Sequence, residues 1–240
     1  LELSKIEDAA RRLKGKIAEP LAWSPNYFDL AGCRIHLKFE NLQYTASFKE
    51  RGACNKLRLL TEEERARGVI AMSAGNHAQG VAYHAQRMGI HAEIVMPRFT
   101  PMVTVDARAL GAEVVLYGAL LEEARSHAVE LATLRGLTFV HPFDDADVIA
   151  GQATVALEML DEVPDLDTLV VAVGGGGLIG GIAAAAKAIQ PRVALSKSSP
   201  DITGMLQSES TMSTWCAFRI DSASAPFLAV KMRSAPKDRN

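Results

Sequence analysis

Short apolar runs alternate with helical patterns along most of this chain, and this alternation limits the folds that it can adopt. The runs with strand character are residues 69–72, 92–96, 113–117, 138–140, 168–173 and 192–195. The segments with helical character are residues 78–88, 101–110, 120–134, 148–160 and 178–189. Repeated strand–helix units are typical of parallel sheets with helices on both faces. The sequence therefore predicts an α/β fold with doubly wound parallel sheets.

The composition excludes several classes of function. The 240 residues carry a net charge of -2, which gives no electrostatic reason to expect nucleic acid or a membrane surface as a partner. Residues 169–186 contain no charge, but their six glycines indicate a buried strand, turn and helix, not a membrane span. The three cysteines lie far apart, which indicates reduced thiols and a cytoplasmic protein. Because the opening stretch, residues 1–16, is charged and amphipathic, we do not expect it to be a signal peptide.

Residues 45–53, with the sequence TASFKERGA, place a lysine at the start of a predicted helix. They follow residues 34–40, an alternating segment that is predicted to be a half-buried strand. Ser47 and Glu50 have the spacing of a capping box, so one interpretation is only a well-capped helix start. The positive end of a helix and burial, however, would both favour the uncharged form of Lys49. An uncharged lysine is a nucleophile that forms Schiff bases, so Lys49 is a candidate catalytic residue.

Four consecutive glycines, Gly174, Gly175, Gly176 and Gly177, lie between a predicted strand and a predicted helix. Without Cβ atoms the backbone can approach a ligand closely, and the following helix offers free N–H groups to an anion. This arrangement predicts a phosphate site. Gly175, Gly177 and Gly180 also fit the dinucleotide pattern G-x-G-x-x-G, but the next strand lacks the acidic end that this pattern requires. A tight strand–helix turn without a ligand is the third interpretation.

The turn at residues 73–80, SAGNHAQG, follows a predicted strand and begins a helix. Ser73 and Asn76 could do no more than cap that helix. Alternatively, the backbone N–H groups of the turn and the Asn76 amide could bind a carboxylate. His77 alone is a satisfied polar residue more readily than a catalyst. The remaining histidines show no ligand spacing, so we expect no histidine-based metal site at His36, His84, His91, His127 or His141.

Together these segments resemble a known family. Residues 47–53, 73–80, 150–154 and 174–177 look like the signature segments of the fold-type II pyridoxal-phosphate enzymes, in the same order along the chain. Within that family, the closest resemblance is to the threonine/serine dehydratase (ammonia-lyase) and serine racemase group. The resemblance extends from about Ile6 to Arg192.

The resemblance implies a tryptophan synthase β-like fold with two doubly wound domains. Residues 1–60 and 142–195 would form a large, discontinuous domain that binds pyridoxal 5'-phosphate. Residues 61–141 would form a small α/β domain. Residues 196–240 are serine-rich and have no regular period, so they are predicted to be an irregular tail. The resemblance also implies a homo-oligomer that acts on a small amino-acid substrate.

The resemblance further implies a role for each signature residue. Lys49 would hold the cofactor as a Schiff base and move the Cα proton of the substrate. Phe48 would flank the cofactor ring, and Asn76 would donate a hydrogen bond to its 3′-oxygen. Ser73, Asn76 and His77 would line the pocket for the substrate carboxylate, while the four glycines would bind the phosphate. The cofactor acts as an electron sink, so L-threonine or L-serine would be converted to a 2-oxo acid and ammonia.

Two features bear on this activity. Serine racemases of the group carry a serine where Ala74 stands, and its hydroxyl is the second proton carrier, so Ala74 favours a dehydratase over a racemase. After Arg192 the resemblance stops, so the large domain is expected to be incomplete at its C-terminus. The alternative function is therefore a truncated remnant that binds the cofactor without catalysis. A dinucleotide-dependent oxidoreductase is a third hypothesis.

Overall fold

The computed structural model of the protein describes residues 1–17, 21–23 and 36–198. The helices are α1 (Leu3–Leu13), α3 (Lys49–Arg58), α4 (Glu62–Arg67), α5 (Asn76–Met88), α6 (Pro101–Ala109), α7 (Leu121–Arg135), α8 (Ala146–Glu162) and α9 (Gly177–Ile189), with a 3-10 turn η1 (Glu40–Leu42). The strands are β1 (Leu21–Trp23), β2 (His36–Lys38), β3 (Val69–Met72), β4 (Ala92–Met96), β5 (Glu113–Leu116), β6 (Thr138–Phe139), β7 (Thr168–Ala172) and β8 (Ala194–Ser198).

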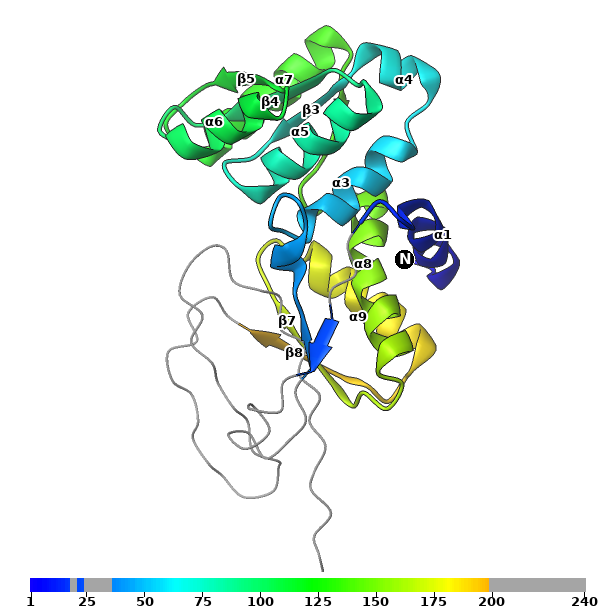
Figure 1. Ribbon diagram of the computed structural model, residues 1–240. Helices are drawn as coiled ribbons and strands as arrows, with labels where there is room; N and C mark the ends of the chain where they lie inside the picture. Colours follow the sequence, from blue (N-terminus) through cyan, green and yellow to red (C-terminus); the bar gives the residue numbers. More distant parts are fainter. Residues whose placement is uncertain (18–20, 24–35, 199–240) are drawn as a thin grey trace, which may run out of the picture.

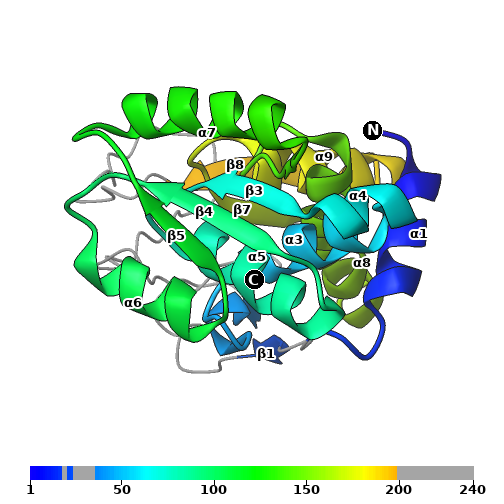
Figure 2. The ribbon, with the colours of Figure 1, turned by 90° about the horizontal axis from the view of Figure 1, so that it is seen from above.

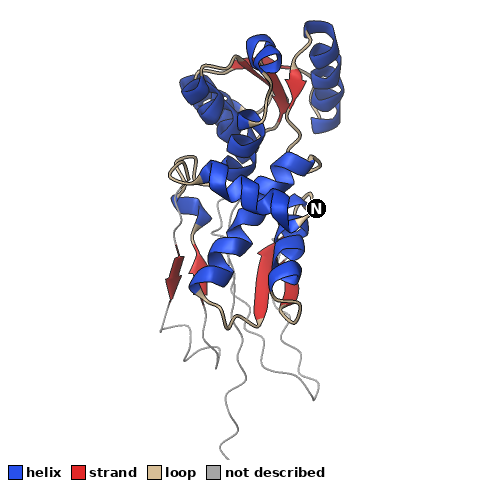
Figure 3. Cartoon of the chain, turned by 90° about the vertical axis from the view of Figure 1, so that its right-hand side faces the viewer, coloured by secondary structure: helices blue, strands red, loops and turns tan. Residues whose placement is uncertain are grey.

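The described strands form two parallel sheets and one antiparallel pair, β1 with β2. The larger parallel sheet lies at one end of the molecule, and the pair β7-β8 lies toward the other (Figure 1). Helices fill the space between the two ends, as the view from the side also shows (Figure 3). The site described below lies where α3 joins these two parts.

The larger sheet has the strand order β5-β4-β3-β6, and all of its neighbouring strands are parallel. The chain passes from β3 through β4 to β5, and then returns to place β6 on the other side of β3. Figure 2 shows α7 on one face of this sheet, with α5 and α6 on the other. Because helices cover both faces, every residue of β4 is buried.

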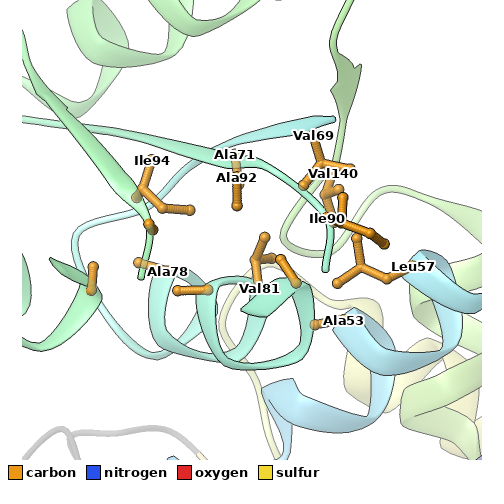
Figure 4. Close-up of a cluster of buried hydrophobic side chains, with 14 of the residues drawn as sticks. Ala53, Leu57, Val69, Ala71, Ala78, Val81, Ile90, Ala92, Ile94 and Val140 are labelled. Carbon is orange, nitrogen blue, oxygen red and sulfur yellow. The ribbon is translucent and has the colours of Figure 1, made fainter. Parts of the chain in front are cut away.

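The largest core of this sheet lies between α5 and the strands (Figure 4). Ala78 and Val81 stand three residues apart on α5, so they share one helix face and pack against Ala71 and Ile94 of the sheet. Leu57 of α3 joins the same cluster. This shared core holds α3 against the four-stranded sheet.

The second parallel sheet, β7-β8, packs against α8 and α9. Leu169 and Val171, alternate residues of β7, are buried with Met159 of α8 and Ile182 of α9. Ile6 of α1 belongs to the same core. The remaining residues of β7 are partly or fully exposed. Strand β7 therefore presents the period of two that is typical of a sheet covered on one face.

Glycines let three helices cross with their backbones in contact. A Cβ atom on Gly151 of α8 would come within 2.6 Å of the carbonyl oxygen of Arg51 in α3. A Cβ atom on Gly181 of α9 would come within 2.7 Å of the carbonyl oxygen of Ile149 in α8. Side chains at these positions would force the helices apart. Backbone contacts therefore set the spacing of α3, α8 and α9.

A buried network of charges ties the same helices to the segment around β2. Arg51 is fully buried, and its guanidinium donates to Glu40 at 2.7 and 2.8 Å and to Glu158. Lys38, also fully buried, lies 2.6 Å from Glu158. Burial alone would lower the pKa of Arg51, but hydrogen bonds and charge interactions with Glu40 and Glu158 outweigh it and raise the pKa. Two cations and two carboxylates thus neutralise one another in the interior.

The predicted α/β fold with parallel sheets is confirmed, and the larger sheet has helices on both faces (Figure 2). The proposed capping box at the start of α3 is wrong: the Ser47 hydroxyl accepts the N–H of Lys49 at 3.2 Å, and Glu50 accepts the N–H of Thr45. A capping box instead begins α4: the Thr61 hydroxyl accepts the N–H of Glu64, and the Glu64 carboxylate accepts the N–H of Thr61. That short helix was not predicted, since its six residues carry no apolar face.

Two predicted segments begin or end at other residues in the structure. Strand β8 continues to Ser198, into the segment that was predicted to be irregular, and residues 199–240 lie outside the described part. Within the predicted strand 34–40, β2 covers only His36–Lys38, and residues 34 and 35 are outside the described part.

We propose that the chain has two domains. Residues 1–60 and 142–195 would form one, and residues 61–141 would form the other. No helix in the described ranges is long and apolar enough to cross a membrane.

Candidate active site

Strands β3 and β6 end where the strand order of the larger sheet reverses. In open parallel sheets, ligands bind outside the carboxyl ends of the strands at such a reversal. The turn after β3 begins with Ser73, whose hydroxyl accepts the N–H of Gly75 at 3.1 Å, and α5 starts at Asn76. The loop after β6 contains His141 and Pro142. The topology therefore brings the polar turn and this loop to one edge of the sheet.

Helix α3 places Lys49 beside this edge. A Cβ atom on Gly80 of α5 would lie 3.3 Å from the Lys49 carbonyl group, so the backbones of α3 and α5 nearly touch. The Lys49 ammonium donates to the Pro142 carbonyl at 2.6 Å and lies 5.3 Å from the centre of the Phe48 ring. Burial lowers the pKa of Lys49 from 10.5 to about 8. About one in ten of these lysines is then uncharged at pH 7, far more than for an exposed lysine.

The side chain of His77 lies in the interior. It is 2% exposed, and its Nε2 atom lies 2.9 Å from the Val140 carbonyl oxygen. Burial and then the charge of Lys49 lower the pKa of His77 to about 3, so the imidazole is neutral and donates Nε2–H to that carbonyl. A neutral, inward-pointing ring gives no charge to a carboxylate. Only the backbone N–H of His77 is left for the predicted role in carboxylate binding.

The four glycines after β7 divide into two pairs. A Cβ atom on Gly174 or Gly176 would meet nothing within 4 Å, and Gly176 has a φ of 89°, which residues with side chains rarely adopt. A Cβ atom on Gly175 would fall on the ring of Phe143, and one on Gly177 would lie 2.6 Å from the Phe143 carbonyl oxygen. The first pair leaves open space beside the start of α9, where backbone N–H groups suit an anion. The second pair accommodates the loop after β6.

The sequence matches the family model described as pyridoxal-phosphate dependent enzyme over residues 14–234. That range includes nearly the whole chain. The chain belongs to this family. Its cofactor class and its fold-type II architecture are those predicted from the signature segments.

A bacterial protein is similar to this chain in sequence, and two plant proteins are similar to it in sequence and fold. The L-threonine ammonia-lyase of Thermotoga maritima is 50% identical over 195 residues, which cover 80% of this chain and 49% of that protein. Threonine deaminase isoform 2 of Solanum lycopersicum is 42% identical with a TM-score of 0.77, over 82% of this chain and 55% of that one. Maize serine racemase is 34% identical with a TM-score of 0.79, over 82% and 60%. The chain thus spans about half the length of the first of these relatives.

The residues at this edge fit the cofactor of the family. The aldehyde group of pyridoxal phosphate reacts with an uncharged amine, and the lowered pKa of Lys49 supplies one. Its phosphate needs N–H donors with no side chain in front of them, and Gly174 and Gly176 leave that space open. Its ring needs an apolar neighbour, and Phe48 packs beside Lys49. We therefore keep the predicted roles of these residues, and that of Asn76 at the start of α5, as proposals.

The loop after β6 connects the predicted site residues and was missed at the sequence level. Pro142 accepts the bond from Lys49, and Phe143 packs on Gly175, so this loop contacts both the lysine and the glycine turn. The His141 ring shapes the loop, because its Nδ1 atom accepts the N–H groups of Phe143 at 3.3 Å and Asp144 at 2.7 Å. The position of these residues directly after a predicted strand was the available signal. The same signal had identified Ser73.

One further group of titratable residues lies at the opposite end of β4. Ligand atoms of His91, Glu93 and Glu113 lie within 4.8 Å of one another. The guanidinium of Arg135 already donates to Glu93 at 2.6 Å and lies 4.0 Å from Glu113. One guanidinium thus already lies beside both carboxylates and offsets part of their negative charge. The expectation that histidines hold no metal stays a prediction.

The two kinds of glycine should respond differently to alanine. Gly175→Ala should lower the free energy of unfolding of the cofactor-free chain by about 1–3 kcal/mol, because the new methyl group overlaps the Phe143 ring. Gly174→Ala should leave this stability nearly unchanged but weaken binding of pyridoxal phosphate, because its methyl group enters the open space. Urea unfolding and titration with the cofactor measure the two effects. Equal stability of both variants would contradict this division.

Proposed function

We propose that the chain is a pyridoxal-phosphate-dependent dehydratase (ammonia-lyase) that converts L-threonine, or L-serine, to a 2-oxo acid and ammonia. Relatives that are 50% and 42% identical carry the names L-threonine ammonia-lyase and threonine deaminase. Because the chain spans 49% of the length of the first of them, the activity of the whole relative is a proposal for this chain. The observation that carries it is the partly buried Lys49, with its lowered pKa, at the edge where β3 and β6 end.

When bound, the cofactor supplies an electron sink for the substrate carbanion. The chain supplies binding and proton transfer. Lys49 would hold the cofactor covalently through Nζ and, once displaced by the substrate amine, would move the Cα proton. Phe48 would flank the ring, and Asn76 would donate to its 3′-oxygen. The backbone N–H groups around Ser73 and His77 would bind the substrate carboxylate.

The phosphate would bind on one side of the glycine turn, opposite the side that packs against Phe143. Gly174 and Gly176 leave the open space, and we propose that their backbone faces the phosphate. Gly175 and Gly177 belong to the phosphate site through their N–H groups, while their Cα atoms pack against Phe143. The phosphate would thus lie at the start of α9, where the helix dipole also favours an anion.

A catalytically impaired chain that still binds the cofactor is the second candidate. We keep it beside the first because the match covers 49% of the first relative, so the activity of that whole protein is only proposed for this chain. Serine racemase is the less favoured activity. Ala74 stands where that group has a serine, and alanine has no proton to give to the opposite face of the substrate.

Release of a 2-oxo acid tests the activity. The purified chain, loaded with pyridoxal phosphate, is expected to release 2-oxobutanoate from L-threonine and pyruvate from L-serine. The ratio of the two rates decides the preferred substrate. Visible absorption of the bound cofactor without any 2-oxo acid would favour the impaired chain. Formation of D-serine without a 2-oxo acid would favour the racemase.

We further propose a homo-oligomer in the cytoplasm that acts on a small amino acid and binds no nucleic acid. A buried free thiol at Cys54 supports a reducing compartment. Apolar side chains on the surface, such as Phe99 and Leu134, which are 82% and 78% exposed, support contacts with other copies. A monomer in light scattering would contradict the oligomer.

A further inference from the structure

Glu50, the residue after Lys49, makes a buried contact with α5 that the proposed chemistry does not use. Glu50 and His84 are 2% and 3% exposed, and Glu50 Oε2 lies 3.6 Å from His84 Nε2. The other carboxylate oxygen of Glu50 accepts the N–H of Thr45. Burying a carboxylate is costly unless a positive partner compensates it. His84 is placed to be that partner.

The surroundings of His84 favour its charged form. Burial alone would lower the pKa of His84, but interactions with Cys54 and Glu50, both on α3, outweigh burial and raise the pKa above 6.5. From α5 itself, the Tyr83 ring lies edge-on to His84 at 4.8 Å. The guanidinium of Arg87 lies over the Tyr83 ring, 5.5 Å from the ring centre. A protonated His84 thus faces both the Cys54 sulfur and the Glu50 carboxylate on α3.

A second contact acts between the same two segments. Tyr44 stacks on Tyr83 with ring centres 4.3 Å apart, so the segment that leads to Lys49 also lies on α5. Lys49 lies between Tyr44 and Glu50 in the chain, and Gly80 lets the α5 backbone come close to the Lys49 backbone. Helix α5 therefore holds the lysine turn before, at and after Lys49.

Helix α5 also carries the residues proposed to bind the cofactor and the substrate. Asn76 is its first residue, and His84 follows about two turns later on the same helix. Because a helix of this length is stiff, a contact at His84 fixes where Asn76 lies relative to α3. We infer that Glu50 and His84 are positioning residues, which hold the lysine turn against α5 and so set the place of Asn76 relative to Lys49. This inference rests on the proposed cofactor site.

The Glu50–His84 pair should weaken as the pH rises. The unfolded chain has an ordinary histidine pKa near 6.5, and the folded chain has a raised one. The stability that the pair contributes is therefore fully present below about pH 6.5 and is lost as the pH rises through the raised pKa. A residue that only fills space would show no such dependence.

Four forms of the full chain test the inference: the wild type, His84→Gln, Glu50→Gln and the double variant. His91→Gln is the matched control, because this histidine is half exposed and lies at the opposite end of the sheet. We expect His84→Gln to bind pyridoxal phosphate about tenfold more weakly than the wild type at pH 6.5, and the ratio to approach one at higher pH. Lys49 titrates in every form, so its own effect cancels in the ratio. The losses in the single variants should not add in the double variant.

A second measurement separates this inference from the proposed function. Thermal unfolding of the cofactor-free wild type should show its advantage over His84→Gln mainly at low pH. If the wild type does not bind the cofactor, the proposed function fails, and unfolding still decides whether the pair forms. A loss that is equal at every pH, or additive losses in the double variant, would overturn the inference. If His84→Gln does not fold, Glu50→Gln, whose amide oxygen can still accept from Thr45, carries the same comparison.

Discussion

Replacing Lys49 with alanine is expected to abolish the visible absorption of the lysine-bound cofactor and to lower turnover of L-threonine by at least about a thousandfold. The variant would lose both the nucleophile that holds the cofactor and the amine that moves the proton. Absorption spectroscopy and the 2-oxo acid assay measure the two losses. A variant that kept both the absorption and the turnover would refute the role of Lys49.

Lys56→Ala is the matched control, since Lys56 lies on the same helix and has the opposite pKa shift. Burial alone would lower the pKa of Lys56, but Asp145 and Asp147, each 2.9 Å from its ammonium, outweigh burial and raise it. Lys56 therefore stays charged at neutral pH and cannot act as the nucleophile. Lys56→Ala should keep the visible absorption.

The pH dependence of stability gives a second check on Lys49 that needs no cofactor. Its pKa is about 8 in the folded chain, against 10.5 for an ordinary lysine such as that of the unfolded chain. Between these values the unfolded chain binds more protons than the folded chain, so the stability of the wild type rises with pH. Lys49→Ala lacks this rise. Its stability relative to the wild type should therefore fall as the pH increases from about 8 to about 10.5.

Replacing Arg51 with methionine is expected to lower the free energy of unfolding by about 3–5 kcal/mol. The guanidinium is fully buried and donates to both Glu40 and Glu158, so its loss leaves Lys38 to compensate two carboxylates. Breaking a buried ion pair costs more than the pair contributes, because the remaining charge stays without compensation. Chemical unfolding at neutral pH measures this loss.

Arg125→Met provides the comparison on the surface. Arg125 pairs with Glu122 one helix turn away, and their side chains are 51% and 75% exposed. Water compensates each charge there, so this variant should change the free energy of unfolding by less than about 1 kcal/mol. Equal losses in the two variants would contradict the expectation that a buried ion pair is more costly to break than an exposed one.

The sequence predicted the architecture well because the signals were strong and local. Apolar runs such as the one at residues 92–96 become strands when helices cover both faces of the sheet, and the glycines at the joins marked the turns. The short helix Glu62–Arg67 escaped prediction, since a segment without an apolar face has no helical period to detect. The capping prediction failed at Ser47 because Glu50, which would complete the box, is recruited by Thr45 and His84.

The candidate site was predictable residue by residue, but its connections were not. Lys49 and the glycine turn carry sequence signals, whereas the contact of Lys49 with Pro142 depends on two segments that are 93 residues apart. The inward orientation of His77 likewise depends on Val140, a residue of the neighbouring strand end. The four glycines are equivalent at the sequence level, and the position of Phe143 is what distinguishes the two pairs.

The backbone contacts among α3, α8 and α9 have a consequence for the cofactor. Lys49 begins α3 and the glycine turn begins α9, and α8 touches both helices through Gly151 and Gly181. Rotamer changes alter distances that side chains define, but they do not alter distances that backbones define. The proposed covalent anchor at Lys49 and the proposed phosphate anchor at the glycine turn should therefore keep a nearly constant backbone separation while the molecule fluctuates. The turn at Ser73, which we propose faces the substrate, belongs to the other sheet, and the contacts of α5 with the Lys49 segment hold it beside this pair of anchors.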